Sequence, residues 1–246
     1  MKPGSWFVFT FALSAASTPV VAALFEFSGT ATHNGQTLYT EGHQVEGNCA
    51  QGVFAPSNHE VAYLRPNDAT AFASKRLNYD NHPFRPRVEF SQPAFDESLA
   101  ITYPDDEALR ILWQEPAGET REFNVPVEQR LVVDSGFDYF VRANWDRVSN
   151  GESIEFQFLA PTRGEHYGFV LEPASAEQIE ADITVRIRPT SVVLRFLVDP
   201  IVLGYRSDGA LTDYLGLTNI RRDADSNHVA HIQYDVTRMP GCELTP

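Results

Sequence analysis

The chain has 246 residues, of which 33 are acidic and 19 are lysine or arginine, so its formal net charge at pH 7 is -14. Such a surplus of carboxylates repels phosphate backbones and anionic membrane surfaces, so a nucleic-acid partner is not expected. A salty or GC-rich source produces the same acidic, lysine-poor composition, so the charge by itself does not indicate a function.

The first segment of the chain has the layout of a secretory signal peptide. A single positive charge, Lys2, precedes an uncharged stretch that begins at Trp6, and small residues at Ala22 and Ala23 suit cleavage by a signal peptidase. We therefore predict that residues 1–23 are a leader. The alternative is a retained membrane anchor, but the second half of the stretch is rich in Ser, Thr and Pro and is a poor spanning helix.

After removal of the leader, residues 24–246 are expected to form a single β-rich domain. No other apolar run approaches a transmembrane length, so no transmembrane segment is expected in the mature chain. The expected location is the periplasm or the exterior of the cell.

Two cysteines, Cys49 and Cys242, remain in the mature chain. In an oxidising compartment two thiols allow one intramolecular pairing, so we predict a disulfide between them. Its role would be structural, holding the C-terminal tail near the first hairpins. A redox-active pair is the alternative, but it normally requires the close C-x-x-C spacing, which is missing here.

Short alternating segments separated by turn residues dominate the mature chain, and this pattern is typical of antiparallel β structure. The clearest example is the pair of strands flanking Asn34-Gly35, a dipeptide that accepts the positive φ angles of a type I′ hairpin turn. The expected strands are residues 24–33, 36–44, 59–65, 69–79, 109–114, 120–125, 153–159, 166–172, 178–188, 191–198, 201–206, 211–217 and 227–234.

One amphipathic helix interrupts the strands. Phe137, Phe140, Val141 and Trp145 follow the three-and-four spacing of an apolar helix face, which predicts a helix from Asp134 to Asn150. Its apolar face must pack against the sheet. The predicted fold class is therefore mainly β: a strongly curved antiparallel sheet, or open barrel, packed around one amphipathic helix.

Motifs for nucleophilic catalysis are missing from the sequence. It contains no G-x-S-x-G elbow, no S-x-x-K and no cysteine placed as a catalytic thiol. Catalytic residues are therefore unknown from the sequence, and no cofactor is expected.

Histidines and carboxylates also fail to form a convincing metal motif. His59 and Glu60 begin like a zinc-protease helix, but the second histidine is missing and the segment reads as a strand. Glu41 and His43 share one strand face and could supply two metal ligands, although a cross-strand hydrogen-bonded pair is the favoured interpretation. The acidic turn at Asp223 lacks the glycine and the glutamate of a calcium loop. No metal site is expected.

Aromatic side chains are the remaining signal. A concave sheet could fill its interior with large rings or leave a cavity for a lipid-like ligand, and ordinary core packing is the default interpretation. The candidate ligand-binding residues are Trp113, Trp145, Phe156, Phe158, Tyr167 and Phe169.

The C-terminal half resembles a group of proteobacterial periplasmic proteins. The resemblance covers roughly residues 150–236 and rests on the stretch Val192–Leu197, on Asp199-Pro200, on Tyr214–Ile220 and on a closing strand, Val229–Tyr234. These proteins are loosely similar to the DUF3108 and lipoprotein-carrier (LolA-like) half-barrels. The resemblance implies an unclosed antiparallel barrel around a helix, sometimes used to hold acyl chains or lipoprotein tails, and it transfers no functional residue.

Three classes of function follow from these observations. The leading hypothesis is a soluble periplasmic binding or carrier protein for an apolar, lipid- or acyl-like ligand, without enzymatic activity. One alternative is a structural or assembly factor that contacts an envelope protein through exposed strand edges. The other is a hydrolase with a site that the sequence does not reveal.

Overall fold

The computed structural model describes residues 22–195 and 199–246. In these residues fifteen strands form one continuous sheet, in the order β8-β7-β6-β5-β4-β3-β2-β1-β15-β14-β13-β12-β11-β10-β9. Neighbouring strands are antiparallel, except that the two-residue strand β9 pairs in parallel with β10. The terminal strands β8 and β9 are not paired with each other, so the curved sheet is open. This confirms the predicted fold class.

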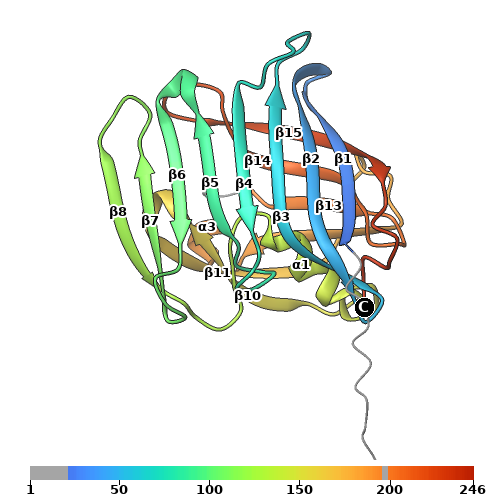
Figure 1. Cartoon of the computed structure of the whole chain (residues 1–246). Helices are drawn as coiled ribbons and strands as arrows, with labels where there is room; N and C mark the ends of the chain where they lie inside the picture. Colours follow the sequence, from blue (N-terminus) through green and yellow to red (C-terminus); the bar gives the residue numbers. More distant parts are fainter. Residues whose placement is uncertain (1–21, 196–198) are drawn as a thin grey trace, which may run out of the picture.

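Strands β1 to β8 form an up-and-down meander, which we call the front wall and which faces the viewer in Figure 1. They are β1 (Ala22–His33), β2 (Gln36–Ala50), β3 (Val53–Leu64), β4 (Ala73–Asn78), β5 (Arg87–Gln92), β6 (Glu97–Thr102), β7 (Ala108–Gln114) and β8 (Thr120–Pro126). A short 3-10 turn, η1 (Pro93–Phe95), connects β5 to β6.

Strands β10 to β15 form a second meander, which we call the back wall and whose strands run across those of the front wall in Figure 1. They are β10 (Ile154–Ala160), β11 (Glu165–Pro173), β12 (Ile183–Pro189), β13 (Ile201–Tyr205), β14 (Leu211–Arg221) and β15 (Asn227–Arg238), with β9 (Leu131–Val132) at the free edge. The turn η2 (Pro161–Arg163) connects β10 to β11. The two walls are joined where β15 pairs with β1.

The predicted helix is present but broken into α1 (Gly136–Ala143) and α2 (Trp145–Ser149). At the break, the Asn144 side chain donates a hydrogen bond of 2.8 Å to the carbonyl of Phe140. An asparagine side chain that bonds to the backbone in this way competes with the regular helix. Gly136 lets α1 begin close to the chain before β5, because a Cβ at this position would lie 2.2 Å from the carbonyl oxygen of Phe84.

Helices α1 and α2 contribute to two hydrophobic clusters. Tyr139 belongs to the cluster built mainly on the front wall, whereas Phe140, Val141 and Val148 belong to the cluster built on the back wall. The apolar face of the predicted helix therefore packs on the sheet as expected. None of the helices in the described part of the chain is both long enough and apolar enough to cross a membrane.

Two expectations about local structure were wrong or incomplete. The expected strand 191–198 is a helical turn, α3 (Val192–Arg195), closed by a bond from the Arg195 amide to the carbonyl of Ser191, and residues 196–198 lie outside the described residues. Valines favour strands only where a neighbouring strand pairs with them, and the pairing of β12 with β11 ends with the bond from the Thr190 amide to the Gly168 carbonyl. Strands β5 and β6 were not anticipated, although Val88 and Phe90 alternate with polar residues.

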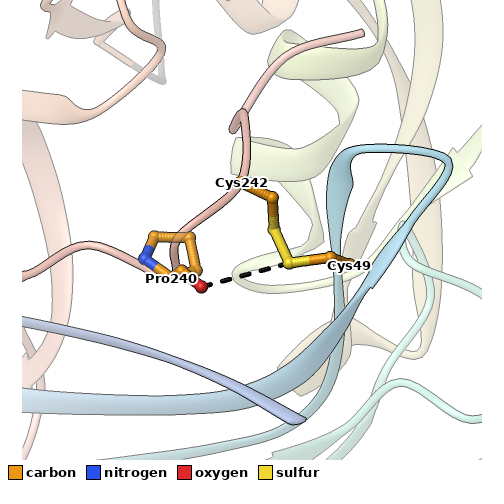
Figure 2. The surroundings of a disulfide bond; sticks show 3 residues. All are labelled: Cys49, Pro240 and Cys242. Atoms are coloured by element: carbon orange, nitrogen blue, oxygen red, sulfur yellow. Dashed lines mark hydrogen bonds between the residues drawn. A yellow bond between two sulfur atoms is a disulfide. The ribbon is translucent and has the colours of Figure 1, made fainter. Parts of the chain in front are cut away.

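The predicted disulfide between Cys49 and Cys242 is present, with the two Cα atoms 6.0 Å apart. Figure 2 shows it joining the end of β2 to the C-terminal segment, beside the carbonyl of Pro240. Next to it, the Phe54 amide donates to the Glu243 carbonyl at 2.8 Å. The C-terminal tail is thus fixed to the first hairpins, as predicted. The predicted leader falls almost entirely on residues 1–21, which lie outside the described residues; Ala22 and Ala23 are the first residues of β1.

Candidate functional site

Polar side chains are built into the inner face of the front wall. Directly paired residues of an antiparallel sheet share a face, so a row of partners can be followed from strand to strand. One inner row runs Phe27, His43, Val61, Lys75 and Phe90. The polar members of this row lie among apolar neighbours, and charged groups in such surroundings require specific partners.

The first polar group on this face is a continuous chain of four side chains. Tyr234 of β15 donates a hydrogen bond of 2.6 Å to Oε1 of Glu41, and Nε2 of His43 lies 3.1 Å from the same oxygen. Nδ1 of His43 lies 2.9 Å from Nε2 of His59 on β3. The chain therefore links β15, β2 and β3 across the inner face, and it includes the Glu41–His43 pair that the sequence indicated.

Gly29 makes this chain sterically feasible. Gly29 on β1 pairs with both Tyr234 and Glu41, so the tyrosine ring must cross the glycine to reach the carboxylate. A Cβ at residue 29 would lie 2.7 Å from Cε1 of Tyr234, which is too close for a real contact. A side chain at this position would displace the ring.

Burial and hydrogen bonding have opposite effects on the pKa values of the side chains in this hydrogen-bonded group. Burial raises the pKa of Glu41, but the hydrogen bond and the charge of His43 and the bond from Tyr234 outweigh burial and hold this pKa below its usual value. Burial, with the charges of His43 and Lys75, lowers the pKa of His59 well below its usual value. At neutral pH Glu41 is therefore an anion and His59 is uncharged.

A second polar group ties the start of α1 to the front wall. The ammonium of Lys75 on β4 bonds to both carboxylate oxygens of Asp134, at 2.8 Å and 3.0 Å, and Asn219 of β14 donates to the same carboxylate at 3.3 Å. Burial raises the pKa of Asp134, but the charge and hydrogen bond of Lys75, with bonds from Ser135, lower it overall. Asp134 has a φ of 46°, a left-handed conformation that non-glycine residues adopt with strain.

A third polar group lies on α1 itself. Arg142 pairs with Asp138 at 2.8 Å and donates to the carbonyl of Gly209 at 3.0 Å, and Tyr205 donates to Asp138 at 3.1 Å. The Arg142 guanidinium also lies 5.5 Å from the ring centre of Phe25 on β1. Burial raises the pKa of Asp138 despite the opposing charge of Arg142. Helix α1 thus carries buried charges that contact both walls.

The chemistry available to these groups is limited. No serine or cysteine is hydrogen-bonded to a histidine anywhere in residues 22–195 and 199–246. Within the same ranges, no group of three or more His, Cys, Asp and Glu side chains is arranged to hold a metal ion. The buried groups can hold protons and fix α1 in place, but they lack a paired nucleophile.

Four of the six predicted aromatic residues come together on the back wall. Phe156 and Phe158 of β10 and Phe169 of β11 have ring centres 5.7 Å to 6.2 Å apart. Tyr167 is the register partner of Phe158. Phe156 is buried, whereas the other three are half-buried. This part of the inner face, close to the free edge at β9, is therefore not completely covered.

The other two predicted residues lie elsewhere. Trp113 is half-buried on the inner face of β7 in the front wall, where its indole donates to Glu97 at 3.1 Å. Trp145 of α2 packs against Tyr205, with ring centres 5.7 Å apart. A further aromatic residue, Phe123 of β8, was not predicted. It touches the turn between β10 and β11, since a Cβ at Gly164 would lie 2.3 Å from its ring.

Two surface hollows lie on the outer face of the front wall and not among these aromatic residues. The first, of about 530 Å³, has a floor of small residues that are register partners, including Gly42, Ala62 and Ser74. The second, of about 470 Å³, adjoins it and is lined by polar residues such as Asn58 and Glu89. Neither hollow is lined by any of the six aromatic residues predicted from the sequence.

Several of the polar residues were missed by reasoning from the sequence. The signal for Lys75 was its isolation, because it is the single lysine that follows Lys2 in the chain. Asp134 was recognised as the start of the predicted helix, but its partner Lys75 was not. His59 was noticed only within a rejected zinc-protease motif, and Tyr234 carried no local signal, because their partners lie on other strands.

No family model matches the chain, and no curated protein matches it. Among solved structures, the chain is similar to an outer membrane lipoprotein-sorting protein domain from Vibrio parahaemolyticus, with 10% sequence identity over 88% of this chain and 83% of that one. The TM-score is 0.28, and a likeness at this level carries no argument about function.

Proposed function

We propose that the protein is a non-enzymatic periplasmic binding or carrier protein for an apolar, acyl-chain ligand. The observation that carries the proposal is the set of half-buried aromatic side chains on the inner faces at both free ends of the sheet. Trp113 and Phe123 belong to the end at β8, and Phe158, Tyr167 and Phe169 belong to the end at β9. Incompletely covered aromatic surface in a concave setting suits an apolar ligand.

The openness of the sheet supplies a route for such a ligand. The terminal strands are not hydrogen-bonded to each other, so the ends can separate without breaking a strand pair. The contact between Phe123 and the turn at Gly164 is a side-chain contact, which costs less to open than a hydrogen-bonded ladder. An acyl chain entering here would meet the half-buried rings at the two ends of the sheet, such as Trp113, Phe158 and Phe169.

The disulfide supports the proposed location. A bond between Cys49 and Cys242 persists in an oxidising compartment such as the periplasm, and the predicted leader would direct export there.

Lipid uptake by the purified protein tests the proposal. Native mass spectrometry of gently prepared protein should show a bound lipid-sized molecule, and a fluorescent fatty acid should bind with saturation. Phe158→Ala should weaken the binding of the probe by about tenfold, the equivalent of one lost aromatic contact. Leu217→Ala, on the exposed outer face of β14, is the matched control and should leave binding unchanged. The absence of both a copurifying molecule and fatty-acid uptake would refute the proposal.

A further inference from the structure

The two free edges of the sheet differ in length and in exposure. At one end, β9 has only two residues, Leu131 and Val132, and both are buried. At the other end, β8 has seven residues, of which five are exposed, and Figure 1 shows no segment of the described ranges along its free edge. The pairing of β8 with β7 is regular, without a bulge. A long, regular and exposed edge offers unpaired backbone groups to another strand.

The register of β7 and β8 determines which backbone groups point away from the sheet. Just before β8, the Glu115 amide donates to the Glu119 carbonyl at 3.2 Å. In an antiparallel pair, residues that bond to the partner strand alternate with residues whose N–H and C=O point the other way. The N–H and C=O groups of Thr120, Glu122 and Asn124 therefore point towards the free edge.

The charged side chains of β8 are already compensated within its own hairpin. Arg121 forms an ion pair with Glu115, and Glu122 accepts hydrogen bonds of 2.7 Å and 3.0 Å from Arg110 of β7. Lysine and proline are typical of edges that are protected from pairing, but β8 contains no lysine, and its one proline, Pro126, is its last residue. The strand is therefore open to a partner along most of its length.

We propose that β8 pairs with β8 of a second copy of this chain, antiparallel and about a two-fold axis at Phe123, the middle residue of the strand. This register uses all seven residues and places Glu122 opposite Asn124 of the partner subunit, where an amide can donate to a carboxylate. An axis at Glu122 or at Arg121 would instead place like charges opposite each other. An axis nearer to Pro126 would leave part of the strand unpaired. The edge is thus complementary to itself in one register.

The pairing joins the inner faces of the two copies. Phe123 is half-buried, and it lies on the inner face because it is the register partner of the buried Ile111. Directly opposite residues share a face, so Phe123 would meet Phe123 of the partner subunit on that side. The aromatic end of one inner face then continues into that of the other. The pairing needs no ligand and goes beyond the proposed function, so a chain that takes up no fatty acid should still form the dimer.

Single-cysteine variants test the register. Both natural cysteines are joined in the disulfide, so an introduced cysteine supplies a single reactive thiol. The residues at the axis form a pair without backbone hydrogen bonds, whose Cα atoms lie about 4.5 Å apart, within reach of a disulfide. Under mild oxidation, Phe123→Cys should form a covalent dimer at least about tenfold faster than Arg121→Cys, whose two copies would lie roughly 13 Å apart along the strands. Equal rates would indicate random collisions and would overturn the proposal.

Sedimentation of the purified protein without added cysteines tests the dimer itself. The wild type should sediment with twice the mass of one chain. Asn124→Pro removes an N–H that faces the free edge in each copy, and it should raise the Kd of the dimer by about 30-fold, the equivalent of two backbone hydrogen bonds. Asn124→Ala keeps this N–H and is the matched control, with a change below about threefold. A wild type that stays monomeric, or an Asn124→Pro variant that dimerises like the wild type, would overturn the proposal.

Discussion

The inner faces of the two walls are built from different chemistry. The back wall presents a mainly apolar surface to α1, with Phe156, Leu171, Val185 and Leu203 all buried, and its polar contacts with the helix are those of Tyr205 with Asp138 and of the Gly209 carbonyl with Arg142. The front wall presents Glu41, His59 and Lys75 among its aromatic residues, all three of them buried. Burial of the apolar side chains of the back wall stabilises the fold without requiring one exact orientation. Burial of the polar groups of the front wall costs free energy unless every hydrogen-bonding partner is in place. The back wall therefore anchors α1, and the front wall determines its position.

The largest loss of stability should come from a substitution among the apolar side chains of the back wall. Phe156→Ala removes a ring that packs on Phe140 and Phe158, and it should lower the free energy of unfolding by about 4 kcal/mol, through lost burial and the cavity left behind. Urea unfolding followed by circular dichroism measures this change. Leu112→Ala, at an exposed position of β7, is the control and should cost less than about 0.5 kcal/mol. Equal costs for the two variants would contradict the placement of Phe156 in the buried cluster of the back wall.

The second largest loss of stability should come from breaking the buried ion pair between Lys75 of the front wall and Asp134. Lys75→Met leaves the carboxylate of Asp134 buried without its cation, and it should cost about 3 kcal/mol of unfolding free energy. Adding Asp134→Asn removes the stranded charge and keeps a residue that tolerates a positive φ, so the double variant should be more stable than Lys75→Met alone. Urea unfolding of Lys75→Met, Asp134→Asn and the double variant measures these differences. If the losses of the two single variants simply add in the double variant, Lys75 and Asp134 are not coupled and the ion pair does not hold α1 against the front wall.

A smaller effect is expected from the hydrogen bond that crosses Gly29. Tyr234→Phe removes the donor to the Glu41 carboxylate and should cost about 2 kcal/mol, because bonds to charged groups contribute more than neutral ones. Tyr214→Phe offers a matched comparison, since its hydroxyl donates to the neutral carbonyl of Leu217, and it should cost about 1 kcal/mol. Thermal unfolding of the two variants side by side gives the difference. The reverse order would show that Glu41 does not depend on Tyr234.

The smallest effect belongs to an ion cluster on the outer face of the back wall. Bonds from Arg188 lower the pKa of Glu172 to about 2, with bonds and charge from Arg186 acting the same way against some burial. A depressed pKa means that the unfolded chain binds the proton more readily, so the stabilisation is complete above about pH 4.5 and is lost as pH falls towards 2.

Because Arg186 is 41% exposed, solvent screens this cluster, and Glu172→Gln should cost only about 1 kcal/mol at pH 7. Below pH 2 the variant and the wild type should have equal stability. Unfolding midpoints measured across this pH range provide the check, and a cost independent of pH would mean that packing rather than charge is responsible.

Much of the architecture could be predicted from local patterns. Alternation along the strands, the turn at Asn34-Gly35 and the apolar spacing around Phe140 each depend on neighbouring residues. These signals correctly indicated a curved antiparallel sheet with an internal helix. The disulfide between Cys49 and Cys242 was also predictable, because two cysteines permit only one intramolecular pair. The strand expected at 191–198 failed because local β propensity cannot reveal whether a neighbouring strand is present.

The pairing of the buried polar side chains depends on the tertiary structure alone. Tyr234 meets Glu41 across 193 positions of the sequence, and Lys75 meets Asp134 across 59, because β15 closes against β1 and α1 is carried back onto β4. Local patterns in the sequence establish which residues alternate, where the chain turns and that Glu41 and His43 share a face. Which charges become buried together depends on the order of strands in the sheet, and hydrogen bonds between distant strands leave no periodic pattern in the sequence.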